Sequence, residues 1–265
     1  MRQVFFGQTT DKRVASHGDE TGMSARCVLL DGEETLSRMF WALFFGALFM
    51  FILGGAPRVL AADTDMPVLV EVFTNKNCPN CPANEKKLKE KAAEDSRLLV
   101  VFSHVDYWDK KARTPDPFSL AEATARQYDY SNTLGRRPGE VFTPQPILNG
   151  AFVAAPPLFM NWGPGLSQAL GAPIMHKLKV SREAKGGVVV DIPEAVAGRD
   201  DLVLWVMGVE KATDSPTYHL RGLQEVEMAG ENRLTLRAAM VPEGEHLIAV
   251  LQKIGPSAVV GLGQE

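Results

Sequence analysis

The stretch from Pro67 to Pro82, which reads Pro-Val-Leu-Val-Glu-Val-Phe-Thr-Asn-Lys-Asn-Cys-Pro-Asn-Cys-Pro, decides which fold is expected. It opens with an apolar run rich in valine, residues 67–74, which is typical of a strand buried in a sheet. Residues 83–95 then place leucine and alanine at helical spacing among lysine and glutamate, and residues 98–105 form a second apolar run. The order strand, helix, strand predicts two parallel strands joined by a helical crossover.

Cys78 and Cys81 stand between the predicted strand and the predicted helix. A cysteine at a helix N-terminus is expected to have a lowered thiol pKa, because the unpaired N–H groups and the helix dipole stabilise its thiolate. Cys81, one turn further on, can reach the first sulfur and resolve a mixed disulfide. Pro79 suits the first helical turn, and Lys76 adds positive charge nearby. The pattern favours thiol–disulfide exchange.

Two other uses of this cysteine pair stay open. A structural disulfide across so short a loop removes little entropy from the unfolded chain, so it would stabilise the fold by only about 2 kcal/mol. A metal centre would need His104 or His176 as further ligands, and soft Cu(I) is the metal that two thiolates favour. Because no second Cys or His pair follows at short spacing, we predict neither a resident metal nor a cofactor.

The rest of the sequence predicts a helical insertion and a β-rich C-terminal part. Residues 119–134 carry a capping box followed by a helical pattern, and Asn149-Gly150 between two apolar runs predicts a two-residue hairpin. From residue 174 onward, short apolar runs separated by glycine predict a small antiparallel, sandwich-like β-domain. The runs are residues 178–183, 188–192, 202–209, 234–239 and 247–252.

The first 61 residues have the pattern of a targeting region. Residues 39–56 form an uncharged apolar run that follows Arg38, and Val59 and Ala61 fit the small-residue pattern of a cleavage site. The pattern predicts a signal peptide cleaved after Ala61 or, alternatively, a retained membrane anchor, which is the one way the protein would meet a membrane. Both predict a periplasmic or secreted protein. Residues 1–38 are polar and aperiodic, as expected of a start codon placed too far upstream or of a short cytosolic tail.

The composition narrows the possible functions. The chain has 265 residues, with 28 Lys and Arg against 32 Asp and Glu, which gives a net charge of −4. Without a basic surplus, no nucleic-acid partner is predicted. Three cysteines are too few for a disulfide-stapled scaffold. Removal of the targeting region would leave Cys78 and Cys81 as the only thiols, in an oxidising compartment.

Three stretches occur in this order: Phe73-Thr-x-x-x-Cys-x-x-Cys-Pro82, then His104-Val-Asp-Tyr-Trp-Asp109, then Thr143-Pro-Gln145 with Asn149-Gly150. Together they resemble the thioredoxin superfamily, and more closely an uncharacterised (domain-of-unknown-function) family of exported bacterial thioredoxin-like proteins. The resemblance implies an α/β, thioredoxin-like domain over residues 66–173, followed by the β-rich domain over residues 174–265.

The resemblance also implies a function. It indicates an exported thiol–disulfide oxidoreductase whose Cys78-Pro-Asn-Cys81 pair acts on protein or small thiol substrates and meets a redox partner protein. Two alternatives stay open, a Cu(I)-binding carrier and a non-catalytic binding module that keeps the fold.

The resemblance assigns roles to three further residues. Pro144 would lie against the cysteines with a cis bond from Thr143, which exposes the preceding backbone to a substrate peptide; a trans proline entering an edge strand is the alternative. Glu71 would be the buried acid of the active-site strand, with a raised pKa, and would exchange a proton with Cys81. A glutamate on an exposed strand face is the alternative.

His104, Asp106 and Trp108 alternate at the C-terminal end of the second predicted strand, the end at which open α/β sheets place their sites. We expect His104 to tune the thiolate, Asp106 to orient His104, and Trp108 with Tyr107 to line a substrate groove. Packing in the core is the alternative for each.

Overall fold

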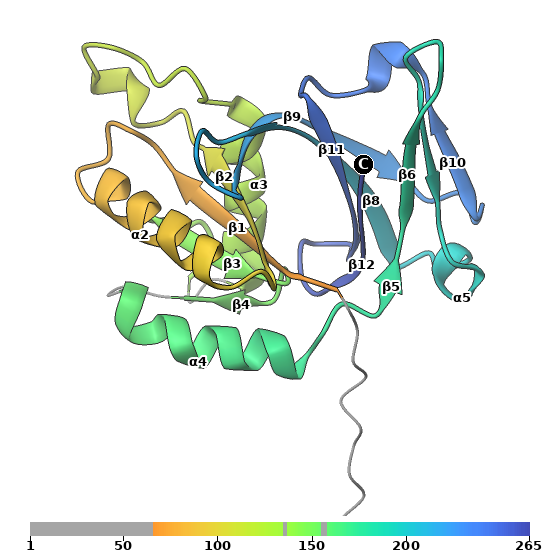
Figure 1. Ribbon diagram of the computed structural model, residues 1–265, viewed down its shortest axis with the longest axis horizontal. Coiled ribbons are helices and arrows are strands. Elements are labelled where there is room, and N and C mark those ends of the chain that lie inside the picture. Colours follow the sequence, from red (N-terminus) through yellow and green to blue (C-terminus); the bar gives the residue numbers. More distant parts are fainter. Residues whose placement is uncertain (1–65, 135–136, 155–157) are drawn as a thin grey trace, which may run out of the picture. The chain divides into compact units, whose positions relative to one another are not determined.

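A computed structural model describes residues 66–134, 137–154 and 158–265 (Figure 1). The predicted targeting region, residues 1–61, lies outside the described residues. The described ranges belong to one compact unit. Within these ranges, no helix is both long enough and apolar enough to cross a membrane.

The fold is mixed α/β, with one large mixed sheet and a second, antiparallel sheet. The large sheet contains β1 (Val68–Thr74), β2 (Leu98–His104), β3 (Gln145–Leu148), β4 (Phe152–Val153), β5 (His176–Lys177), β8 (Leu202–Lys211), β9 (Tyr218–Glu227), β11 (His246–Lys253) and β12 (Val259–Gln264). The second sheet contains β6 (Lys179–Arg182), β7 (Val188–Asp191) and β10 (Arg233–Leu236). The helices are α2 (Cys81–Glu94), α3 (Ala121–Leu134), α4 (Leu158–Gly171) and α5 (Glu194–Ala197), with short 3-10 helices at Asp109–Lys111 and Ala238–Met240.

The large sheet has the strand order β4-β3-β1-β2-β9-β8-β11-β12-β5. β1 and β2 pair in parallel along their whole length, with α2 between them in sequence, as the sequence pattern predicted. β3 runs antiparallel to β1 and forms a hairpin with β4.

Both faces of β1 are covered, so all seven of its residues are buried and most of them are apolar. Val70 and Val72 pack with Leu88 of α2 and with residues of α4 on one face. Leu69 packs with Ala123 of α3 on the other face. Two helices thus cover one face of the first half of the sheet, and α3 covers the opposite face (Figure 1).

The hairpin predicted at Asn149-Gly150 is present, but its loop holds three residues because Leu148 pairs with Phe152. Asn149 and Gly150 both have positive φ angles, 47° and 68°, which asparagine and glycine tolerate best. The Asn149 side chain accepts a hydrogen bond from the N–H of Leu69 at 3.0 Å. This bond fixes the turn to the start of β1.

Four long strands of the C-terminal part continue the large sheet. β9 pairs in parallel with β2, where Val101 lies opposite Tyr218 and Phe102 lies opposite His219. β8, β11 and β12 extend the same sheet with antiparallel pairs. The sequence pattern missed β9 because polar residues such as Arg221 interrupt its apolar alternation.

The second sheet, in the order β10-β7-β6, packs on the outer half of the large sheet. Val188 and Val190 of β7 share a buried cluster with Leu204 of β8 and Leu251 of β11. Two packed sheets therefore occur in the C-terminal part, and one of them is continuous with the strand that leads to the cysteine pair.

Candidate functional site

The cysteine pair lies where the chain passes from β1 into α2. β1 ends at Thr74, and α2 begins at Cys81, so Cys78 precedes the helix by one tight turn. Cys78 and Cys81 form a disulfide, and the Cys81 N–H donates to the Cys78 carbonyl at 3.1 Å. Because the helix begins later than expected, Pro82 and not Pro79 fills its first turn.

The N-terminus of α2 is open toward the disulfide. No side chain caps it, and its first turn holds no acidic residue. The first N–H groups of the helix therefore keep their positive potential, which favours a thiolate at this position.

Both sulfur-bearing residues are buried in the disulfide state. Cys78 is 2% exposed and Cys81 is fully buried. The sequence led us to expect an accessible sulfur, so the structure shows a more closed site than the pattern indicated.

The segment around Thr143 lies against the disulfide. The Thr143–Pro144 peptide bond is cis, as the resemblance implied, and Pro144 is buried. The carbonyl oxygen of Thr143 lies 3.7 Å from the sulfur of Cys78, and Trp108 donates from Nε1 to Thr143 Oγ1 at 2.9 Å. Of the predicted site residues, the fold thus brings Cys78, Thr143 and Trp108 together.

We expect the Trp108→Ala variant to be reduced by dithiothreitol severalfold faster than the wild type, because the indole no longer holds the Thr143 segment against Cys78. Trp108→Phe, which keeps a ring but loses the N–H donor, is the control and should lie between the two. The rate of disulfide reduction measures the effect. Equal rates for all three proteins would show that the indole does not limit access.

A loop that follows β2 is tied to the turn before Cys78. Asn75 is buried and donates from Nδ2 to the Val105 carbonyl at 2.8 Å and to Ser119 Oγ at 3.0 Å. Asn77 donates to Asp109 Oδ1 at 2.9 Å. Burial by itself raises the pKa of Asp109, but hydrogen bonds led by that of Ser119 outweigh it and lower that pKa. Asp109 is thus tied to the turn that carries Cys78.

His104 ends β2 and is buried between two partners. Its Nδ1 lies 2.8 Å from Asp116 Oδ2, and its Nε2 lies 3.0 Å from Nδ1 of His219. The same Asp116 oxygen accepts the backbone N–H of Lys76 at 2.6 Å. The Lys76 side chain itself is exposed, so its backbone makes the defined contact.

The alternating pattern predicted that Asp106 orients His104, and this prediction is wrong. The Asp106 carboxylate accepts a hydrogen bond from Thr124 Oγ1 of α3 at 2.7 Å. The alternation fails because β2 ends at His104, after which the chain turns. Asp116, twelve residues along the chain from His104, takes the expected role.

Asp116 and His219 both have shifted pKa values. Burial by itself raises the pKa of Asp116, but the hydrogen bonds from His104 and from the Lys76 N–H bring it down to about 2. Burial, followed by the charge of His104, lowers the pKa of His219 to about 4. His219 therefore resists protonation in the folded protein.

This shift predicts a pH dependence of stability. The unfolded chain takes up a proton on His219 near the ordinary value of 6.5, but the folded protein does so only near pH 4. The His219 contribution is thus fully present above about pH 6.5 and is lost as the pH falls toward 4, by roughly 3 kcal/mol. The free energy of unfolding, measured with urea across this pH range, should depend less steeply on pH in His219→Phe than in the wild type. The His246→Gln variant, changed at an exposed histidine, should keep the wild-type dependence on pH. The same dependence of the free energy of unfolding on pH in the wild type and in His219→Phe would contradict the prediction.

Glu71 is buried, as the resemblance implied, but its partner is Arg126. Both of its oxygens bind Arg126, with Nε to Oε1 at 2.7 Å and Nη2 to Oε2 at 3.1 Å. Tyr130 adds a hydrogen bond to Oε2 at 3.2 Å, and Arg126 also donates to Gln252 of β11 at 3.1 Å. Burial by itself lowers the pKa of Arg126, but the charges of Glu71 and Tyr130 and the hydrogen bond to Glu71 together outweigh it and raise that pKa.

This ion pair lies on the face of β1 that α3 covers, whereas α2 packs on the opposite face. Glu71 is therefore engaged with Arg126, and the fold does not bring it together with the cysteine pair. One weak signal of the cluster is visible in the sequence: Arg126 and Tyr130 stand four residues apart, on one side of the predicted helix.

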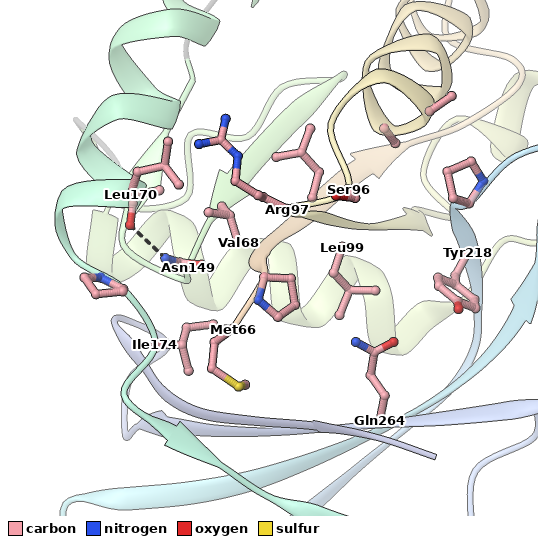
Figure 2. A pocket seen from close by; sticks show the side chains of 17 residues that line it. Met66, Val68, Ser96, Arg97, Leu99, Asn149, Leu170, Ile174, Tyr218 and Gln264 are labelled. Atoms are coloured by element: carbon pink, nitrogen blue, oxygen red, sulfur yellow. Dashed lines mark hydrogen bonds between the residues drawn. The ribbon is translucent and has the colours of Figure 1, made fainter. Parts of the chain in front are cut away.

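A separate cavity of about 1020 Å³ lies at the opposite end of β1 (Figure 2). Met66, Val68, Leu99, Ile174 and Tyr218 line it with apolar surface. Val68 begins β1 and Thr74 ends it, so the cavity and the cysteine pair are separated by about 20 Å of strand. In the part of the chain that the structure describes, no group of three or more His, Cys, Asp or Glu side chains is placed to hold a metal ion.

Fold and site define an α/β protein with a disulfide at a strand-to-helix junction and a buried histidine pair at the end of the neighbouring strand. The chain belongs to the family described as "Protein of unknown function (DUF1223)", which matches residues 69–219. That range contains both cysteines, Pro144 and, as its last residue, His219. A crystal structure of a protein from Agrobacterium tumefaciens is similar, with 26% identity and a TM-score of 0.55, covering 75% of this chain and 93% of that one. No curated protein matches the sequence.

Proposed function

We propose that the protein is a thiol–disulfide oxidoreductase built on a thioredoxin-like unit. The order β4-β3-β1-β2, with α2 between β1 and β2, α3 before β3 and α4 after β4, supports this assignment. The observation that carries the function is the Cys78–Cys81 disulfide at the β1–α2 junction, in contact with the Thr143 carbonyl.

The exchange follows from the disulfide state. A substrate thiolate attacks the sulfur of Cys78, the Cys78–Cys81 bond breaks, and Cys81 leaves as a thiolate. A second substrate thiolate then attacks the substrate sulfur of this mixed disulfide. It forms the substrate disulfide and releases Cys78 as a thiolate, so two electrons pass from the substrate to the protein. The reverse sequence reduces a substrate disulfide.

Burial divides the roles of the two cysteines. Cys81 has no exposed surface, so Cys78 is the sulfur that meets the substrate. The uncapped N-terminus of α2 stabilises the thiolate that each step releases. The Thr143 carbonyl, 3.7 Å from Cys78, is placed to accept a hydrogen bond from the reduced thiol.

The decisive experiment is to trap mixed disulfides. A Cys81→Ala variant lacks the resolving thiol, so partners attacked by Cys78 should stay bound and be released by dithiothreitol. The same search with a Cys78→Ala variant is the control. If neither variant retains a partner, and purified protein neither reduces insulin nor oxidises a dithiol peptide, the function is not thiol exchange. Stoichiometric Cu(I) binding that requires Cys78, without exchange, would instead identify a metal carrier.

The proposal includes export, since an oxidising compartment keeps the pair as a disulfide. Residues 39–61 supply the sequence basis for it. N-terminal sequencing of the protein recovered from the periplasm or the medium should begin at Ala62. A chain recovered in the cytosol with residues 39–61 intact would overturn this part of the proposal.

A further inference from the structure

Three buried titratable side chains form a line of hydrogen bonds that thiol exchange itself does not use. Asp116 is 5% exposed, His104 is 3% exposed and His219 is 9% exposed. Asp116 contacts His104 at 2.8 Å, and His104 contacts His219 at 3.0 Å. In the neutral state, the imidazoles satisfy both bonds when His104 donates from Nδ1 to Asp116 and His219 donates from Nδ1 to His104.

The line begins at the turn that carries Cys78. Asp116 accepts the N–H of Lys76, two residues before Cys78, and its backbone N–H donates to Asp109 Oδ1 at 3.0 Å. Asp109 in turn binds Asn75 and Asn77 of the same turn. The carboxylate of Asp116 is therefore a fixed negative charge built into the wall of the cysteine loop.

The line ends on β9, in the C-terminal part of the chain. His219 is held there by rings, since it stacks on Phe118 with centroids 4.3 Å apart and lies 5.6 Å from Phe102. Besides Asp116 and the two imidazoles, Lys89 of α2 and Arg221 of β9 act electrostatically on His219, and both oppose its protonation. For His219, Asp116 is thus the anion that favours protonation, and Lys89 and Arg221 are the cations that oppose it.

We propose that Asp116, His104 and His219 form a proton-linked unit that sets the reactivity of Cys78, an inference that rests on the proposed function. With both imidazoles neutral, the unit carries the negative charge of Asp116, which raises the pKa of a nearby thiol. When the histidine pair takes up one proton, that charge is compensated and the Cys78 thiolate becomes more stable. These are positioning residues, since they act on the Cys78 sulfur through their electrostatic field and through the hydrogen bond to the loop that carries it.

Linkage makes the effect reciprocal. If protonation of the pair stabilises the Cys78 thiolate, then forming that thiolate must favour protonation of the pair by the same factor. Reduction of the disulfide, at a pH where Cys78 is ionised, should therefore raise the pKa of the histidine pair. The burial that lowers the pKa of His219 to about 4 in the disulfide state leaves room for this rise.

The first test measures alkylation of reduced Cys78 by iodoacetamide from pH 4 to 9, in a Cys81→Ser background so that one thiol reports. Asp116→Asn keeps an acceptor for the Lys76 N–H but removes the charge, and it should raise the alkylation rate at pH 6 by about tenfold. His219→Phe should remove the acid-side inflection of the profile. The exposed His246→Gln is the matched control and should change neither feature. Profiles of folded Asp116→Asn and His219→Phe that superimpose on the parent profile would overturn the proposal.

A second test needs no substitution and serves if the variants do not fold. NMR titration of the imidazoles in the wild-type protein compares the disulfide and dithiol forms. The His104–His219 pair should titrate at higher pH in the dithiol form, while His246 stays unchanged. Identical titration in both forms would overturn the proposal and leave the oxidoreductase assignment standing, since that is tested by trapping and insulin reduction.

Discussion

Cys78→Ser is expected to abolish thiol–disulfide exchange, with a loss of about three orders of magnitude or more in dithiol oxidation. The reason is geometric, because Cys81 is fully buried and cannot replace Cys78 as the sulfur that the substrate meets. Stopped-flow measurement of dithiol peptide oxidation by the purified disulfide form gives the rate.

Cys81→Ser separates attack from resolution. This variant keeps Cys78 and should form one equivalent of mixed disulfide with a pre-oxidised substrate, after which turnover stops. If Cys78→Ser retained exchange while Cys81→Ser lost the first step, the assignment of the two roles would be reversed.

Arg126→Met is expected to lower the free energy of unfolding by about 3–5 kcal/mol, because it leaves the Glu71 carboxylate buried without its partner. Both side chains are 1% exposed, so water cannot replace the lost bonds. Tyr130 and Gln252, which also bind Arg126, lose their charged partner at the same time. Urea unfolding near neutral pH measures the change.

The double variant Glu71→Met with Arg126→Met should be more stable than Arg126→Met alone, since it buries no unpaired charge. An exposed ion pair supplies the control: Arg199 and Asp201 make short contacts at the surface, and Arg199→Met should change stability by less than about 1 kcal/mol. A similarly small change for Arg126→Met would show that the buried pair contributes little.

The elements nearest to the cysteine pair follow from short-range patterns. The valine run of β1, the helical spacing of α2 and the second apolar run of β2 each repeat within a few residues, and the structure confirms all three. The Asn149-Gly150 turn is equally local, since positive φ angles depend on those two residue types.

The partners of the buried polar residues could not be predicted in this way. Asp106 was expected to orient His104 because both fit one strand period, but the strand ends and Asp116 takes that place. His219 lies 115 residues beyond His104, and Arg126 lies 55 residues beyond Glu71. No periodicity in a sequence extends over such separations.

By itself, the sequence determined that two cysteines stand between a buried strand and a helix, because backbone conformation there depends on neighbouring residues and on the period of apolar side chains. Only the tertiary structure decided that both sulfur-bearing residues are buried, that Glu71 is neutralised by Arg126, and that β9 brings His219 to His104. The physical reason is that a buried charge must find a partner wherever the packed chain places one, and packing joins residues whose distance along the chain carries no signal.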